Sequence, residues 1–227
     1  MTYYSQENLE KMADDINKKY YPKRLEQIIK LDAYDLMERL GLQIEWKYIS
    51  PGLQLLGMIF FGDECWYVWD DDNYNISSKP HLEPFLKKTV VINSHLVNNK
   101  KYEEKGLFVA THECSHWIKD QEYFKNHTTN VIHACGEKRL KGTSWNRCMT
   151  DEEILERQTN YLAAAILMPK DLIKKEFFRR LRFKTIPESA IKCESYMKPV
   201  IRQLSIELGL NYGPVLYRLQ DLKILQR

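Results

Sequence analysis

The sequence predicts an α+β fold, in which a small mixed or antiparallel sheet packs against helices and a helical extension ends the chain. Apolar residues recur at helical spacing at the start of the chain, short β-branched and aromatic runs fill residues 42–93, and helical spacing returns from about residue 102. Because the strands form one block and do not alternate with helices, parallel βαβ units are not expected. At 227 residues and 44% hydrophobic, the chain can bury a substantial core.

Two scaffold helices are expected first. Between Ser5 and Tyr20 the apolar side chains lie on one helical face, and Ser5 is a suitable N-cap. Asp32 can cap a second helix over residues 33–40, and Gly41 suits the left-handed position that follows a helix.

The middle of the chain is expected to supply the sheet. Turn-forming pairs such as Pro51-Gly52 and Gly62-Asp63 separate runs that are rich in β-branched and aromatic residues. The predicted strands are residues 43–49 (QIEWKYI), 55–61 (LLGMIFF), 65–69 (CWYVW) and 89–93 (TVVIN).

A helix expected from about Tyr102 to Lys119 carries His112-Glu-Cys-Ser-His116, a match to H-E-x-x-H. Positions i and i+4 share one helical face, so both imidazoles can bind one ion. Glu113 is rotated by one residue and can reach a water molecule on that ion. These are the groups that zinc-assisted amide hydrolysis requires, although a pattern of five residues can also arise by chance.

The third metal ligand must come from elsewhere in the chain. Zinc proteases with three histidines continue the motif as H-E-x-x-H-x-x-G-x-x-H, but Lys119 and Glu122 occupy the glycine and last histidine positions here. That class is therefore excluded. The other common solution takes a glutamate from a following helix and leaves the fourth position open for water.

A capping box at Thr150–Glu153 predicts that following helix, which offers Glu152, Glu153 and Glu156 as candidates. Acidic residues in a first turn are expected merely to complement the helix dipole, which accounts for the first two. Glu156 is favoured because it adjoins a buried apolar run, where a carboxylate needs a partner. Asn160 lies one turn later and can accept the free N–H of a ligand histidine, which would fix its orientation.

Two motifs in this order resemble those of the ImmA/IrrE family of zinc metallopeptidases. The first is HECSH at 112–116, and the second is ERQTNYLAAAILMP at 156–169, which follows the family's approximate pattern E-x-x-A-N-x-x-A-A-x-x-L-M-P. The resemblance includes the LLGMIFF and TVVIN strands and covers roughly residues 5–172. Thr159 stands where the family usually has alanine and, being small, leaves the zinc site intact.

The resemblance implies a zincin-like metallopeptidase domain over residues 1–172. His112, His116 and Glu156 would be the ligands of one zinc ion per chain, and Glu113 would be the catalytic base. Family members cleave helix-turn-helix repressors of mobile elements or stress regulons, so the expected partner is a protein substrate of that kind. A site of two histidines and one glutamate also suits other divalent metals, and the sequence does not choose among them.

The sequence defines the substrate site less well. An uncovered edge of the 55–61 strand would hold an extended peptide by β-augmentation. Tyr161, His127 and His133 are candidates to stabilise the oxyanion, and none is favoured. Residues 120–149 are expected to form a loop over the active site, with a second zinc site at His133, Cys135 and Cys148 as the weaker alternative.

Residues 173–227 are expected to form a basic helical subdomain. From residue 170 onward there are 13 Lys and Arg against 6 Asp and Glu, whereas the rest of the chain holds 21 against 25. A solvated helical face is the simplest explanation, and contact with an acidic partner or nucleic acid is the other.

The sequence of this segment predicts a basic amphipathic helix at 170–184. It then predicts a helix, a turn around Gly209–Gly213, and a second helix. The second helix of this helix-turn-helix candidate offers only Arg218 and Gln220 to read bases. The alternative function is thus a DNA-binding or stress-response regulator in which the zinc domain is a sensor or scaffold.

Neither a membrane span nor export is expected. No run approaches 18 apolar residues, and the N-terminus lacks the apolar core of a signal peptide. The five cysteines form no C-x-x-C pair, which indicates a reduced, cytoplasmic protein.

Overall fold

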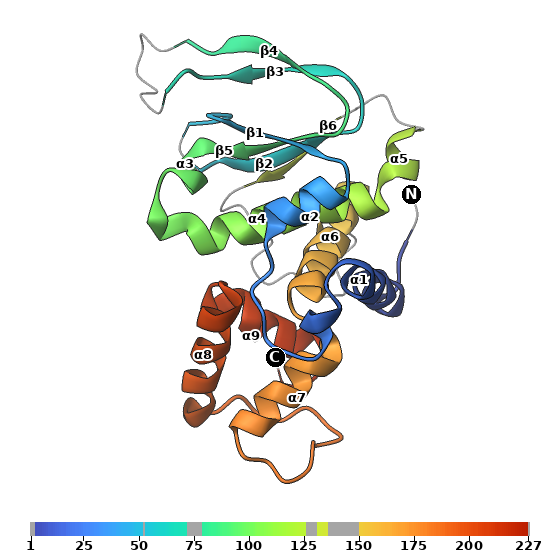
Figure 1. Cartoon of the computed structure of the whole chain (residues 1–227), viewed down its shortest axis with the longest axis vertical. Helices are drawn as coiled ribbons and strands as arrows, with labels where there is room; N and C mark the ends of the chain where they lie inside the picture. Colours follow the sequence, from blue (N-terminus) through green and yellow to red (C-terminus); the bar gives the residue numbers. More distant parts are fainter. Residues whose placement is uncertain (1–2, 52, 72–78, 126–130, 136–149, 227) are drawn as a thin grey trace. The chain divides into compact units, whose positions relative to one another are not determined.

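The computed structural model describes residues 3–51, 53–71, 79–125, 131–135 (backbone only) and 150–226, and it confirms the α+β class (Figure 1). The chain divides into two compact units. We call residues 1–3 and 33–160 the sheet unit, and residues 4–32 and 161–227 the helical unit. The domain boundary expected at residue 172 stays a prediction.

The sheet unit is built on a four-stranded mixed sheet in the order β1-β5-β2-β6. β1 is parallel to β5, whereas β2 is antiparallel to both of its neighbours. The prediction of an uncovered edge at 55–61 is therefore wrong, because β5 and β6 occupy both edges of β2. The strands are β1 (Gln43–Lys47), β2 (Leu55–Phe60), β5 (Thr89–Asn93) and β6 (Val131–Cys135).

A two-stranded hairpin of β3 (Glu64–Val68) and β4 (His81–Phe85) covers one face of this sheet (Figure 1). The Phe60 and Phe85 rings stack with centroids 4.8 Å apart and join the two layers. The buried cluster between the layers contains Ile49, Met58, Phe60, Val68, Phe85 and Val91.

The helix α4 (Glu103–Lys119) lies on the other face of the sheet (Figure 1). Alternate residues of β2 divide between the two layers, as the period of a strand requires. Met58 and Phe60 join the hairpin cluster, whereas Gly57 approaches α4. The shorter helices of this unit are α2 (Ala33–Arg39), α3 (Ser94–Val97), η2 (Lys100–Tyr102) and α5 (Gln121–Lys125).

The helix α6 (Asp151–Leu167) begins with the capping box that the sequence predicts. The Glu153 amide donates to the Thr150 hydroxyl at 3.2 Å, and the Glu153 carboxylate accepts from the Thr150 amide at 3.0 Å. These reciprocal bonds satisfy two backbone donors that the first turn leaves open, and so they fix where the helix starts.

The helical unit has a polar centre around the end of α6. Arg24 donates to the carbonyl oxygens of Ile166 and Leu167 at 3.0 and 2.8 Å and to Asn17 Oδ1 at 2.7 Å. The last carbonyls of a helix have no partner within the helix, and here a buried guanidinium supplies one. The helices of this unit are α1 (Gln6–Tyr20), η1 (Pro22–Leu25), α7 (Lys170–Arg180), η3 (Ser195–Met197), α8 (Lys198–Leu208) and α9 (Tyr212–Asp221).

The expected helix, turn and helix near the C-terminus are present as α8 and α9. Gly209 ends α8 with a φ of 66°, a left-handed conformation that glycine adopts without strain. Gly213, expected in the turn, lies inside α9. Among the helices that the structure describes, none is both long and apolar enough to cross a bilayer.

Candidate metal centre

The buried part of α4 presents His112 and His116 on one face. They are four residues apart, and their Nε2 atoms lie 3.0 Å from each other. Their relative exposures are 3% and 0%, so both imidazoles are taken out of water. Burying two polar rings side by side costs free energy unless a shared partner interacts with both.

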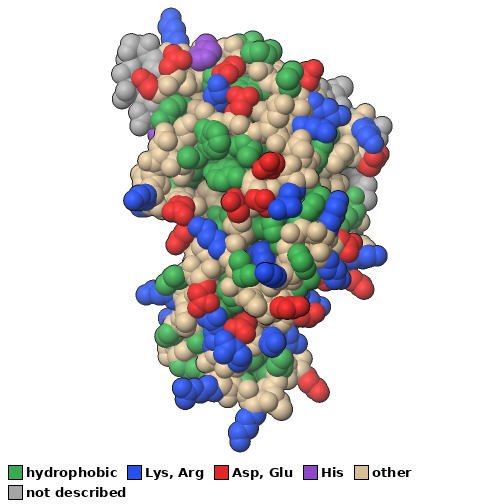
Figure 2. All heavy atoms as spheres, viewed as in Figure 1, with side chains coloured by type: hydrophobic (Ala, Val, Ile, Leu, Met, Phe, Trp, Pro, Cys, Tyr) green, Lys and Arg blue, Asp and Glu red, His purple; other side chains and the backbone are tan. Residues whose placement is uncertain are grey.

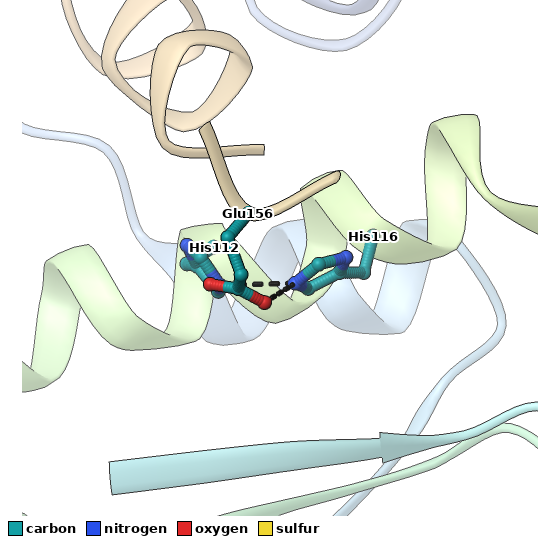
Figure 3. Close-up of side chains that lie close together, drawn as sticks. All are labelled: His112, His116 and Glu156. Carbon is teal, nitrogen blue, oxygen red and sulfur yellow. Dashed lines mark hydrogen bonds and ion pairs between the residues drawn. The ribbon is translucent and has the colours of Figure 1, made fainter. Parts of the chain in front are cut away.

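Glu156 on α6 supplies such a partner (Figure 3). Its carboxylate reaches the two imidazoles, with Oε2 at 3.4 Å from His112 Nε2 and Oε1 at 3.2 Å from His116 Nε2. Ligand atoms of all three residues lie within 4.8 Å of one another. The structure thus brings together the three residues that the sequence predicts as ligands, and this cluster can hold a metal ion.

The pKa values in the cluster favour a negative charge on Glu156 and a positive charge on His116. Burial would raise the pKa of Glu156, but the two histidines outweigh burial and lower this pKa far below its usual range. Burial would lower the pKa of His116, but hydrogen bonds to Asp120 and Glu156 raise it to about 9. Without a metal, a proton on the imidazole therefore supplies the positive charge, and a metal cation can replace it.

Glu113 is fully buried next to this cluster and accepts no hydrogen bond from any residue that the structure describes. Burial raises its pKa to about 8, and the charge of Glu156 adds to the rise while His116 opposes it. A carboxyl group with a pKa near neutrality can both accept and release a proton under physiological conditions. A buried carboxyl group with a raised pKa and no partner among the described residues is typical of a functional site.

Gly57 on β2 makes the room that Glu113 occupies. A Cβ atom at this position would lie 2.9 Å from Val109 Cγ1 and 3.0 Å from Glu113 Oε1. Both distances are shorter than a normal van der Waals contact, so any larger residue would displace one of these side chains. The sheet therefore helps to position the candidate base.

The sequence-based reasoning missed three residues that surround His116. Asp120, Lys119 and Thr159 are all buried, and Asp120 and Thr159 both contact the His116 Nδ1 atom. The spacing of Asp120, four residues after His116 on the same helical path, was the available signal. Asn160, expected to accept an imidazole N–H, donates its amide to the Glu156 backbone carbonyl at 2.8 Å, and its role toward His112 stays a prediction.

The other candidate residues do not join the cluster or lie outside the described side chains. Tyr161 belongs to the helical unit and donates its hydroxyl to Glu10 at 2.6 Å. The predictions that rest on His127, His133, Cys135 and Cys148 fall outside the side chains that the structure describes.

One of the two candidate base readers of α9 is buried. Arg218 is 1% exposed, and its guanidinium forms two bonds of 2.7 and 2.9 Å to the Glu10 carboxylate. Gln220 is half-buried and donates to the Gln226 carbonyl at 3.3 Å. On the face shown in Figure 2, Lys and Arg side chains are intermixed with Asp and Glu. These observations remove Arg218 as a reader of bases and give the DNA-binding alternative no support.

Comparison of the sequence with models of known protein families and with curated proteins returns no significant match. The likeness to the ImmA/IrrE family therefore rests only on the two motifs and on the LLGMIFF and TVVIN strand segments. A functional conclusion has to rest on the chemistry of the His112, His116 and Glu156 cluster and of Glu113 beside it.

Proposed function

We propose that this protein is a zinc-dependent endopeptidase with a zincin-like site of the ImmA/IrrE type. The observation that carries the proposal is the convergence of His112, His116 and Glu156 from two helices beside the buried carboxylate of Glu113, which has no hydrogen-bond partner among the described residues. Two histidines and one glutamate, with a separate carboxylate as base, form the donor set of one class of zinc peptidases.

The spacing of the donor atoms suits zinc. Zinc bonds to nitrogen and oxygen are about 2.0–2.2 Å long, and a tetrahedron of that size has edges of about 3.3–3.6 Å. The two Nε2 atoms are 3.0 Å apart, and each lies close to a different oxygen of the Glu156 carboxylate, at 3.2 Å for His116 and 3.4 Å for His112. One ligand atom from each of the three residues lies within 4.8 Å of the others, so His112, His116 and Glu156 would hold the ion together, and a fourth position would be open to water or substrate.

The chain's own contribution to hydrolysis centres on Glu113. A zinc ion on these ligands would act as a Lewis acid that polarises the scissile carbonyl and acidifies water. Glu113 takes the proton from the attacking water and passes it to the nitrogen of the leaving amine. Its raised pKa makes the carboxylate a stronger base, and the positive charge of a bound metal would favour the ionised form that accepts the proton.

The edge strand β6 suggests how a substrate binds. In the described part of the chain β6 pairs with β2 alone, so its outer edge can pair with an added strand. An extended peptide that pairs with β6 would gain main-chain hydrogen bonds without regard to its sequence. The resemblance points to a helix-turn-helix repressor as the protein that supplies this segment.

Zinc content and hydrolysis test the proposal together. Wild-type protein is expected to bind one zinc ion per chain and to cleave unstructured casein or a helix-turn-helix repressor encoded beside its gene. A chelator should abolish cleavage, and added zinc should restore it. The variant H112A is expected to lose zinc, whereas H81A, which changes an exposed histidine on β4, should keep it. Cleavage that survives complete removal of the metal would contradict the proposal.

Replacing Gly57 by alanine is expected to lower kcat while leaving zinc content unchanged. The added Cβ atom would crowd the side chains of Glu113 and Val109, and its three nearest neighbours include no atom of His112, His116 or Glu156. A displacement of about 1 Å in a reacting group can cost about 100-fold in rate. The matched control is G106A on α4, where an added Cβ has no neighbour closer than 3.8 Å. Equal kcat in G57A and wild type would show that the close approach of Gly57 has no role in catalysis.

A further inference from the structure

The Nδ1 atom of His116, on the side of the ring away from the candidate metal, has two acceptors. Asp120 Oδ2 lies at 2.7 Å and Thr159 Oγ1 at 3.1 Å. The single hydroxyl proton of Thr159 is donated to the Leu155 carbonyl at 2.8 Å, so its oxygen can only accept from the imidazole. Both contacts therefore require a proton on Nδ1, so in the neutral imidazole that binds a metal the lone pair is on Nε2, which faces the metal position.

Lys119 holds the Asp120 carboxylate in place. Its ammonium group lies 2.5 Å from Asp120 Oδ1 and 2.7 Å from Oδ2, and the side chains of Lys119 and Asp120 are 0% and 2% exposed. A buried Lys–Asp pair by itself is weak evidence for stability, because apolar residues of the same volume often serve as well. Here the Asp120 carboxylate also contacts His116, a candidate metal ligand, so the buried pair can act on the metal site as well as on the fold.

From this geometry we infer that Asp120, held by Lys119, is a positioning residue that fixes the tautomer and ring orientation of His116 for metal binding. The inference rests on the proposed metal centre. Carboxylates that accept the second N–H of a ligand histidine make it a better donor, and their loss costs about 10- to 100-fold in metal affinity. Thr159 adds a second, weaker acceptor at a position where the resembling family has alanine.

Zinc affinity, measured by competition with a chromophoric chelator, tests the inference without any substrate. D120A is expected to bind zinc about 10- to 100-fold more weakly than wild type. D120N keeps an oxygen acceptor but no charge, so its zinc affinity should lie between those of wild type and D120A. T159A should lose less zinc affinity than D120A does. The matched control is D35A, in which Asp35 faces Arg39 at the same i, i+4 spacing on the surface and the zinc affinity should not change.

Two further measurements separate positioning from folding. In zinc-loaded wild type, the His116 Nδ1–H should give a slowly exchanging ¹H–¹⁵N signal, and this signal should be lost in D120A. Should D120A not fold, because Lys119 is left buried without its carboxylate, K119M/D120A removes that charge as well. Its metal-free unfolding midpoint shows that it is folded, and its zinc affinity should show the same loss.

A folded D120A or K119M/D120A protein with wild-type zinc affinity and an unchanged Nδ1–H signal would overturn the inference and leave the peptidase proposal intact. Wild-type protein that binds zinc but cleaves nothing would contradict the peptidase proposal. The role of Asp120 would still be decided in that case, because both measurements are made on the bound metal alone.

Discussion

Replacing Glu113 by glutamine is expected to lower kcat/KM for peptide hydrolysis by about 10²- to 10⁴-fold, the usual contribution of a positioned acid–base group. Glutamine keeps the size and shape of the side chain but cannot take the proton of the attacking water. Glu113 is not one of the three clustered ligands, so E113Q should bind zinc as wild type does. The metal-free variant should be about as stable as wild type, because glutamine fills the same volume at this buried position.

The matched control for E113Q is E104Q on the same helix. Glu104 is exposed in the first turn of α4, so this variant makes the same chemical change away from the site. E104Q should retain wild-type activity. If E113Q cleaves the native substrate as fast as wild type, Glu113 is not the base, and if E113Q loses zinc, its role is in metal binding.

Replacing Arg218 by methionine is expected to destabilise the helical unit by about 3–5 kcal/mol, the cost of breaking a buried ion pair on one side. Arg218 bonds both oxygens of Glu10 and donates to the Met168 carbonyl at 3.1 Å. Its guanidinium also lies 5.4 Å from the centre of the Tyr161 ring. R218M would leave Glu10 largely buried with the Tyr161 hydroxyl as a neutral partner. Urea unfolding at pH 7 measures the resulting loss of unfolding free energy.

The destabilisation of R218M should depend on pH in a defined direction. Burial would raise the pKa of Glu10, but Arg218 and Tyr161 outweigh burial and lower it below the usual value. In wild type this interaction therefore stabilises the fold above the unfolded-state pKa of about 4.3, and the stabilisation is lost as pH falls through the folded-state pKa. In R218M the hydrogen bonds and charge of Arg218 are lost while burial remains, so the pKa of Glu10 should rise and more of the group should be protonated at pH 4. The difference in unfolding free energy between wild type and R218M should thus be smaller at pH 4 than at pH 7.

Two variants check the origin of this effect. E10Q/R218M removes the Glu10 carboxylate that has lost Arg218, and it should recover part of the lost stability at pH 7. R179M breaks an exposed pair with Glu176 and should change stability little. A free energy of unfolding for R218M equal to that of wild type at both pH values would show that the buried pair does not stabilise the unit.

Local signals in the sequence determined most of the helices, four of the six strands and the candidate ligands. Helical spacing, the Ser5 and Thr150 caps and the i, i+4 spacing of the histidines act within one or two turns of the chain, so they can be read without knowing the fold. Glu156 was also predictable, because a carboxylate beside a buried apolar run needs a partner. Both histidines and this glutamate meet within 4.8 Å.

Only the tertiary structure decided which strand edges are paired and which polar side chains are buried. β4 contains Pro84 and is not among the strands that the sequence predicts, yet it becomes a strand by pairing with β3. Both edges of β2 are occupied by strands that are distant in sequence. Arg218 looks like a surface residue of α9 until Glu10, 208 positions earlier, is placed against it. Lys119 and Asp120 follow the motif as ordinary polar residues, and only burial makes their ion pair part of the site. Such long-range contacts depend on the packing of the whole unit, and local periodicity does not contain that information.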